Sequence, residues 1–351
     1  MFKLGSLLVI VLFLTACAAP STTRISYAAA EIDAEAALQR ELALKKYLSY
    51  KQRLHSVSYP ILKSASEFCT NKQINSLGAQ GAASGNFEGH WKITADKILK
   101  GDHYTITWVE HNGPAAKAGL AVNDKILAIN NVVFGNNQQQ QQKFYAEKAR
   151  IRTSKTLTAT LKIKRNQELI NLTINQEKIC GYPVLLGDSD AVNAYADGKK
   201  IIITKGMMRF AQDDQDLALV IAHELGHNLM GHIDKKQSNY MLGTLVDLAA
   251  AAKGVNTRGT FRSVGASAFS QDFEAEADYV ALYYMNAAGL PLEGAADFWR
   301  EMAAEHPGSI SSNHSASHPA TSERFLAISN TIAEINHKIA AGEPLRPNIN
   351  E

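Results

Sequence analysis

The sequence has little cysteine and no concentrated positive charge, and both features restrict what the protein does. Only three of its 351 residues are cysteines, and the formal net charge is +2. Lysine and arginine form no dense block and do not alternate with aromatic residues. Nucleic-acid-binding surfaces normally carry such a basic stretch, so no nucleic-acid partner is expected.

Long apolar runs are also absent. The run from Leu242 to Ala252 is apolar, but it is too short to cross a bilayer. With 46% hydrophobic and 20% charged residues, the composition is that of an ordinary globular protein. The length predicts two domains or one large domain.

The N-terminus has the features of an export signal. An apolar run from Leu7 to Leu14 follows a lysine and precedes Thr15-Ala16-Cys17. This arrangement resembles the lipobox of bacterial lipoproteins, with an ordinary signal peptide and a chance cysteine as the alternative. The resemblance implies a signal peptide over residues 1–16, a lipid on Cys17 and a lipidated tether over residues 17–40. Such a chain is anchored to a membrane without spanning it.

Export has consequences for location and for the other cysteines. Ala18 does not resemble the Asp-type signal that retains lipoproteins in the inner membrane, which favours the periplasmic face of the outer membrane. Outside the cytoplasm disulfides persist, and Cys69 and Cys180 can pair in only one way. Two buried free thiols are the alternative.

The middle of the chain changes from helical to β-rich patterning. Apolar residues recur at helical spacing over residues 31–68, where Pro60 is expected to kink or divide the helix. Residues 71–86 are rich in Asn, Gly, Gln and Ser and predict a linker. Four strands are then predicted, over residues 104–109, 125–130, 156–164 and 169–174.

One stretch within this β-rich region has a specific resemblance. A Gly113-Pro114 turn, a short Ala-rich helix and Asn123-Asp124 precede a strand, as in the bacterial PDZ signature. The resemblance implies a PDZ-like domain over residues 84–178. PDZ domains bind extended peptide ends at a sheet edge. Asn123 stands where Gly is usual and the peptide-binding loop is not recognisable, so a spacer without a peptide partner is the alternative.

The chemistry is concentrated in His223-Glu224-Leu225-Gly226-His227, an HExxH sequence. Acidic residues before an apolar run predict a helix over residues 214–232, so the two histidines lie at i and i+4 on one face. Two imidazoles so placed can share one metal ion, and Glu224 can take a proton from an attacking water. The apolar flanks argue against a solvated helix face with two histidines.

A third ligand is needed, and the sequence offers a carboxylate for it. A histidine at the position of Ile233 would complete another known pattern, but Ile233 cannot bind metal. His232 is expected on a different face, in a supporting or surface position. On a second predicted helix, residues 271–288, Glu274 and Asp278 share a face. Glu274 is the expected ligand and Asp278 the carboxylate that orients a ligand histidine, with Glu276 as a competitor that points away.

Together these motifs resemble the gluzincin peptidases grouped with the CAAX prenyl proteases, HtpX and the Oma-type proteases. The resemblance implies one Zn2+ per chain, bound by His223, His227 and Glu274. It implies that Asn193 and Ala194 lie beside the cleft and pair with substrate backbone. His318, in a His-Pro element, would stabilise the oxyanion or cover the zinc in a resting state, and Arg324 would support the site. A loop histidine and a surface arginine are the alternatives.

The resemblance also implies the domain organisation and fold class. Relatives begin with a helix that is followed directly by the Asn-Ala segment, whereas here the PDZ-like region separates the two. The metallopeptidase domain is therefore expected to be discontinuous, over residues 41–72 and 180–345. A Cys69–Cys180 disulfide would tie the ends of the insertion together. The expected fold is α+β, with a mainly helical zincin-type domain, a small sheet and an inserted β-rich domain.

These observations lead to one function and two alternatives. The expected function is a lipid-anchored zinc endopeptidase that hydrolyses misfolded or unassembled envelope proteins, with the PDZ-like domain assisting substrate selection. One alternative is an envelope chaperone or assembly factor with a latent protease site. The other is a PDZ-based scaffold with a structural metal, although structural zinc sites are usually rich in cysteine. Two histidines and a carboxylate also suit Fe(II), but HExxH on a helix favours zinc.

Overall fold

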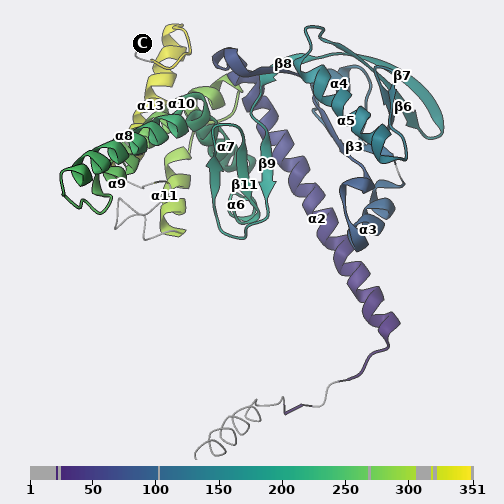
Figure 1. Ribbon diagram of the computed structural model, residues 1–351. Helices are drawn as coiled ribbons and strands as arrows, with labels where there is room; N and C mark the ends of the chain where they lie inside the picture. The colour runs from purple at the N-terminus through teal and green to yellow at the C-terminus, as the bar shows by residue number, and fades with distance from the viewer. Residues whose placement is uncertain are drawn as a thin grey trace, which may run out of the picture. The chain divides into compact units, whose positions relative to one another are not determined.

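A computed structural model describes residues 21–22, 25–101, 103–267, 270–305, 318 and 322–348 (Figure 1). The chain divides into two units, residues 1–43 and the compact unit from Leu44 onward. The fold is α+β, as expected. Within the described ranges, none of the helices combines the length and apolar character needed to cross a bilayer.

Pro60, which was expected to kink or divide the first helical stretch, does not divide it. Helix α2 runs from Ala29 to Ser64 and contains Pro60. It also begins inside the range expected to be a tether. Pro60 cannot donate a backbone hydrogen bond, but it lies close to the C-terminal end of the helix, so the loss affects only the last turns. Two short 3-10 helices, η1 (Ala65–Phe68) and η2 (Thr70–Lys72), follow.

Residues 71–86, which were expected to form a linker, contain strands, and one of these joins the two ends of the β-rich region. Strand β1 (Gln73–Ser76) pairs antiparallel with β8 (Glu177–Cys180), and Gln73 lies opposite Cys180. Cys69 and Cys180 form a disulfide across a sequence separation of 111 residues. The chain therefore enters and leaves the β-rich region at one place.

The β-rich region forms one sheet with helices against it. The sheet order is β2-β3-β4-β6-β7, with β5 paired to β4, so β2 belongs to the sheet although it precedes the expected boundary at residue 84. Ile126, Ile163 and Phe144 are fully buried in its core. Asn123 has a φ of 75°, which explains why Gly is usual at this position. The elements are β2 (Ala79–Ala82), η3 (Ser84–Asn86), α3 (Gly89–Leu99), β3 (Tyr104–Val109), α4 (Pro114–Lys117), β4 (Lys125–Ile129), β5 (Val132–Val133), α5 (Gln138–Thr153), β6 (Thr158–Arg165) and β7 (Glu168–Asn175).

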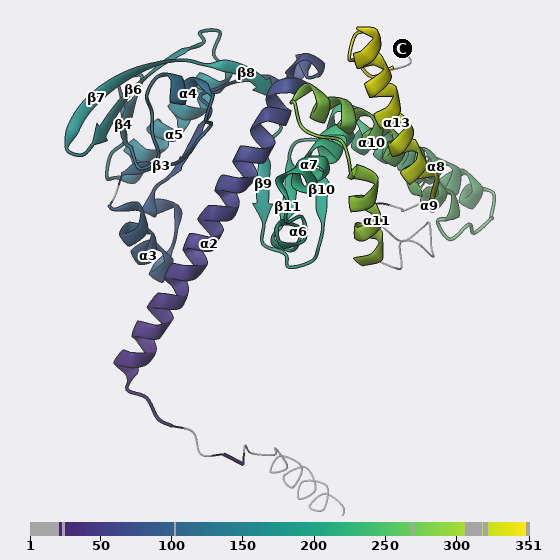
Figure 2. The same ribbon diagram turned by 180° about the vertical axis from the view of Figure 1, so that it is seen from behind.

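The remainder of the chain is mainly helical around a small sheet of order β10-β11-β9 (Figure 2). Its core includes the apolar residues that flank the HExxH histidines on α7 and the buried face of α10. The elements are β9 (Val184–Gly187), β10 (Ala194–Ala196), β11 (Ile201–Thr204), α6 (Lys205–Phe210), α7 (Asp214–Leu229), α8 (His232–Ala252), α9 (Thr260–Ser267), α10 (Ser270–Ala287), α11 (Ala295–Glu305) and α13 (Ser322–Ala341).

Candidate metal centre

The helix that carries the HExxH sequence lies in the core. Asp213 precedes α7, and Asp214 and Asp216 lie in its first turn, where they complement the free N–H groups and the helix dipole. His223, Glu224 and His227 are at most 3% exposed. A buried helix carries three such polar groups only if they have partners, so these side chains require a polar or metal partner inside the protein.

A glycine allows the second helix to approach α7 closely. A Cβ atom added at Gly226 would lie 2.9 Å from Cγ2 of Val280 and 3.0 Å from the carbonyl oxygen of Ala277, both on α10. Any larger residue would push the two helices apart. At this separation Glu274 and Asp278 of α10 face the two histidines, and both carboxylates are buried.

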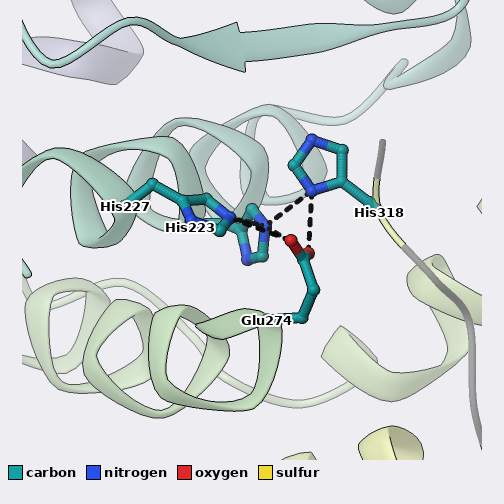
Figure 3. Close-up of side chains that lie close together, drawn as sticks. All are labelled: His223, His227, Glu274 and His318. Atoms are coloured by element: carbon teal, nitrogen blue, oxygen red, sulfur yellow. Dashed lines mark hydrogen bonds and ion pairs between the residues drawn. The ribbon is translucent and has the colours of Figure 1, made fainter. Parts of the chain in front are cut away.

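Four side chains converge on one point (Figure 3). The ligand atoms of His223, His227, Glu274 and His318 all lie within 4.8 Å of one another. The two Nε2 atoms of His223 and His227 are 3.1 Å apart, and the Glu274 carboxylate lies 3.3 Å and 3.4 Å from them. The histidines come from α7, Glu274 comes from α10, and His318 approaches from the opposite side (Figure 3).

The hydrogen bonds behind the first histidine fix which nitrogen faces this cluster. Nδ1 of His223 lies 2.8 Å from the Asp278 carboxylate, which can only accept. Nδ1 therefore donates a hydrogen bond to Asp278, and Nε2 is the nitrogen that faces the cluster. Burial opposes protonation of His223, but Asp278 and Glu274 raise its pKa to about 9. Arg324 is 5% exposed and donates to the same carboxylate at 3.0 Å. Burial opposes ionisation of Asp278, but Arg324 and His223 hold its pKa below the usual value.

A second histidine pair, which the sequence did not predict, supports His227. His232 is fully buried, its Nδ1 lies 2.8 Å from Nδ1 of His227, and its Nε2 lies 2.6 Å from the Glu276 carboxylate. Burial, the largest influence, lowers the pKa of His232 to about 4, so the ring is neutral with one N–H. That N–H points to Glu276, so Nδ1 of His232 accepts from His227, whose Nε2 lone pair faces the cluster.

His232 was expected in a supporting or surface position, and it takes the supporting one, whereas Glu276, which was expected to point away, contacts the site through His232. The reason is local. The predicted helix over residues 214–232 ends at Leu229, and Gly231 adopts a left-handed φ of 67° before α8 begins at His232. This break turns the chain and directs His232 back against His227. A glycine just past a helix end is the signal that could have revealed it.

The donor set fits a divalent metal ion such as zinc. Both histidines turn Nε2 toward the cluster, where a metal ion would displace any proton, and Oε1 of Glu274 is buried without a hydrogen-bond partner among the described residues. Burial opposes ionisation of Glu274, but His318, His223 and His227 hold its pKa well below the usual value. Two neutral imidazoles and one carboxylate at this spacing are a known ligand set for zinc with an open position.

Glu224 and His318 lie beside the open side of the cluster. Oε2 of Glu224 is buried without a partner among the described residues, and its Oε1 lies 3.4 Å from Nε2 of His318. The His318 side chain is 20% exposed, and its Nδ1 lies 2.7 Å from Glu274 and 3.3 Å from Nε2 of His223. His318 therefore contacts both the expected ligands and Glu224.

Asn193 and Ala194, which were expected to lie beside the cleft, are in a segment at the edge of the small sheet. Asn193 precedes the edge strand β10, where Ala194 is buried and Tyr195 is 44% exposed. The backbone of Asn193 bonds to Thr204, which holds the segment at the sheet edge beside α7. Cys17 and Pro319 lie outside the described residues.

A helix bearing two histidines and a glutamate, completed by a carboxylate from a neighbouring helix, defines the class as that of HExxH metallopeptidases. Residues 161–332 match Peptidase family M48, and residues 105–151 match a PDZ domain. Two parts of the chain are therefore similar to known domains, one to the M48 peptidases and the other to PDZ domains.

Similar curated proteins are all named as metallopeptidases. The chain is 32% identical to the metalloprotease LoiP of Escherichia coli, over 38% of this chain and 56% of that protein. It is 26% identical to the metalloprotease YcaL of the same organism, over 40% of this chain and 59% of YcaL. Identity to the mitochondrial metalloendopeptidase OMA1 of Schizosaccharomyces pombe is 27%, over 40% of this chain and 43% of OMA1. The aligned part spans about half the length of these relatives.

Proposed function

We propose that this protein is a zinc-dependent endopeptidase, anchored by a lipid on Cys17, that hydrolyses misfolded or unassembled proteins of the bacterial cell envelope. The observation that carries the proposal is the convergence of His223, His227 and Glu274 on one point beside Glu224. Location and anchoring rest on the sequence before residue 18, and zinc, one ion per chain, rests on the donor set and the family.

Each side chain has a defined task in peptide-bond hydrolysis. A zinc ion held by the two histidines and Glu274 would supply Lewis acidity that polarises the scissile carbonyl. Glu224, whose carboxylate faces the cluster, takes the proton of the attacking water and delivers it to the leaving amine. Asp278 and His232 keep the two ligand rings in the required tautomer. The backbone of Ala194 at the free edge of β10 aligns an extended substrate, with Asn193 near the peptide.

The position of His318 supports a covered resting state. Its contacts with Glu274 and His223 support a resting state in which the ring covers the metal centre. Displacement of His318 by substrate would uncover that centre, and the ring would then be close enough to stabilise the oxyanion. This placement also favours the second candidate function, a chaperone or assembly factor whose protease site is latent.

A cavity beside the PDZ-like domain supports a role in selecting chain ends. The cavity, of about 390 Å3, lies between α2, α5 and β9. Lys51, Lys148 and Arg152 line it, and no acidic side chain does. Burial, the largest influence, together with Lys51 and Lys148 lowers the pKa of His55 to about 4. A peptide carboxylate would neutralise the positive charge of Lys51, Lys148 and Arg152.

Buried polar atoms in the same cavity also lack partners among the described residues. They are Oδ1 of Asn75, which is 0% exposed, and both side-chain polar atoms of Gln176, which is 4% exposed. Leu54, Ile151 and Val184 provide apolar walls. We propose that an apolar peptide ending in a free carboxylate binds here. A Lys148→Ala/Arg152→Ala variant should bind such a peptide at least about tenfold more weakly. Equal binding of the C-terminally amidated peptide by the unmutated protein would contradict this assignment.

Cleavage of an unfolded protein tests the enzymatic function. Residues 18–351 should cut casein at internal bonds, and the Glu224→Gln variant should lose about 1,000-fold or more in rate, because general acid–base catalysis is removed. A His318→Ala variant should be faster than the unmutated protein if the ring covers the site. Cleavage in neither the unmutated protein nor His318→Ala would favour the chaperone function.

A further inference from the structure

The helical hairpin formed by α8 and α9 has no role in the site described above. It joins the HExxH helix α7 to α10, and it contains the apolar run from Leu242 to Ala252 that the sequence singles out. Leu242, Leu245 and Leu248 are each 62% exposed. Further large apolar side chains are exposed on the same hairpin, namely Tyr240, Met241, Val246, Val255, Phe261 and Val264.

The hairpin holds together through glycine rather than through these apolar side chains. A Cβ atom added at Gly243 of α8 would lie 2.1 Å from the carbonyl oxygen of Phe261. One added at Gly265 of α9 would lie 2.2 Å from the carbonyl oxygen of Asn239. The two backbones thus touch at glycines, while leucine, methionine and valine side chains face outward. Helices packed through small residues with an apolar exterior are typical of proteins in contact with lipid.

Positive charge accompanies this apolar surface. Lys253 and Arg258 are exposed in or beside the connection between the helices, and Arg262 is exposed on α9. The only acidic residue from Tyr240 to Ser267 is Asp247, and its carboxylate is used within the hairpin. It accepts from the backbone N–H groups of Arg262 at 2.8 Å and Phe261 at 3.3 Å, and from the Thr257 hydroxyl. The outward charge of the hairpin is therefore positive.

We propose that the α8–α9 hairpin docks on the surface of an anionic lipid bilayer, with its leucines in the interfacial region and its basic residues at the headgroups. The apolar part of α8 is too short to span a bilayer, but an apolar helix flanked by lysine and arginine binds at the interface. In both views the hairpin connection lies at the edge of the ribbon (Figures 1 and 2).

A second copy of this chain fits the surface less well. A symmetric dimer places the same patch on both sides of the interface. Lys253, Arg258 and Arg262 of one copy would then be brought toward the same cations of the other, and Asp247, the one acidic residue from Tyr240 to Ser267, is already bonded within the hairpin. An anionic bilayer supplies both the apolar environment and the opposite charge. Because α8 follows α7 after a single turn, docking would hold the metal centre at a fixed distance from the membrane.

Vesicle flotation tests the proposal independently of catalysis and of the lipid anchor. Residues 18–351, which lack Cys17, are mixed with vesicles of equal parts phosphatidylcholine and phosphatidylglycerol, or of phosphatidylcholine alone. The unmutated protein should float with the anionic vesicles and bind neutral ones more weakly. Leu245→Ser/Leu248→Ser should reduce the bound fraction about tenfold or more, because two apolar side chains no longer enter the interface. Lys253→Gln/Arg258→Gln should reduce binding to the anionic vesicles only.

A matched control and a second measurement separate the outcomes. Leu169→Ser removes a leucine that is 61% exposed on β7 of the PDZ-like domain, and it should bind vesicles as the unmutated protein does. Equal circular dichroism and thermal unfolding would show that the hairpin variants fold. The proposal is overturned if the unmutated protein stays unbound, or if Leu245→Ser/Leu248→Ser still floats fully. It is also overturned if sedimentation shows a dimer that this variant dissociates while vesicles bind nothing.

Discussion

At the scale of single residues, the chemistry of the centre depends on which nitrogen of each ligand histidine carries the proton. Asp278 sets this for His223, and His232 with Glu276 sets it for His227. The two supports differ in kind, since one is a buried carboxylate held by Arg324 and the other is a neutral ring joined to a partly exposed carboxylate. Metal affinity should therefore depend on both, although neither side chain touches the metal position.

Replacing His232 tests the second support. His232→Phe keeps the ring stacked on Phe273, whose centroid lies 4.6 Å away, but removes both hydrogen bonds. We expect zinc affinity to fall roughly 10- to 100-fold, the range found for partners of ligand histidines. Competition with a chromophoric chelator measures it. His337→Phe, at an exposed position on α13, is the matched control and should bind zinc normally.

An unchanged zinc affinity in His232→Phe, together with a lower thermal stability, would mean that His232 only fills space in the core. The same chelator competition on Asp278→Asn provides a positive reference. Loss of the charge that faces His223 should weaken zinc binding whether or not His232 supports His227.

The sequence predicted most of this centre because each ligand lies within a short motif on one helix. HExxH fixes the spacing of His223 and His227, and the i, i+4 spacing of Glu274 and Asp278 places both carboxylates on one face. The contacts of His232 with His227 and Glu276 could not be predicted, because they depend on the break at Gly231, which redirects α8. A contact created by a turn between two helices is not visible in the periodicity of either helix.

At the scale of elements, the distance between α7 and α10 decides whether the ligand set can assemble. The two helices contact through Gly226, which is also a variable position of the HExxH sequence. Sequence patterns predicted both helices and the strands β3, β4, β6 and β7, because alternation and amphipathic spacing are local properties. They missed β1 and β2, whose Asn, Gly and Gln residues predict a loop, because these strands are stabilised by pairing with the distant β8 and β3.

Gly226→Val should separate α7 from α10. The added side chain would meet Val280 and Ala277, and overpacking of this kind typically costs about 1–3 kcal/mol of unfolding free energy. Because Glu274 moves with α10, zinc affinity should fall as well. Denaturant unfolding and chelator competition measure the two effects. Gly85→Ala, where an added Cβ meets only the side chain of Gln141, should leave the unfolding free energy and the zinc affinity unchanged. A Gly226→Val protein that binds zinc as tightly as the unmutated protein would contradict the account.

At the scale of the whole molecule, the peptidase part depends on segments that lie on both sides of the PDZ-like domain. Helix α2 and the strands β9 to β11 share one apolar core, although more than a hundred residues separate them in the sequence. The discontinuous domain over residues 41–72 and 180–345 remains a prediction in its boundaries. The β1–β8 pairing and the Cys69–Cys180 disulfide show how such an arrangement is held at the junction.

Removing the disulfide tests the importance of that junction. Cys69→Ser/Cys180→Ser should lose about 2–5 kcal/mol of unfolding free energy, because the bridge closes a long loop in the unfolded chain. Denaturant unfolding with and without reductant measures the loss. Reductant should destabilise the unmutated protein to the level of the double variant and leave the variant unaffected. Equal stability of both proteins without reductant would mean that the cysteines stay unpaired in solution.

Zinc content measured on three purified forms of residues 18–351 tests the central claim most directly. The unmutated protein and Glu224→Gln should each hold about one zinc ion per chain, because Glu224 faces the cluster without being needed as a ligand. Glu274→Gln should lose most of its zinc at the same folded content by circular dichroism, since the third ligand is removed. No zinc in the unmutated protein, or full zinc in a folded Glu274→Gln, would contradict the assignment of His223, His227 and Glu274 as the metal centre.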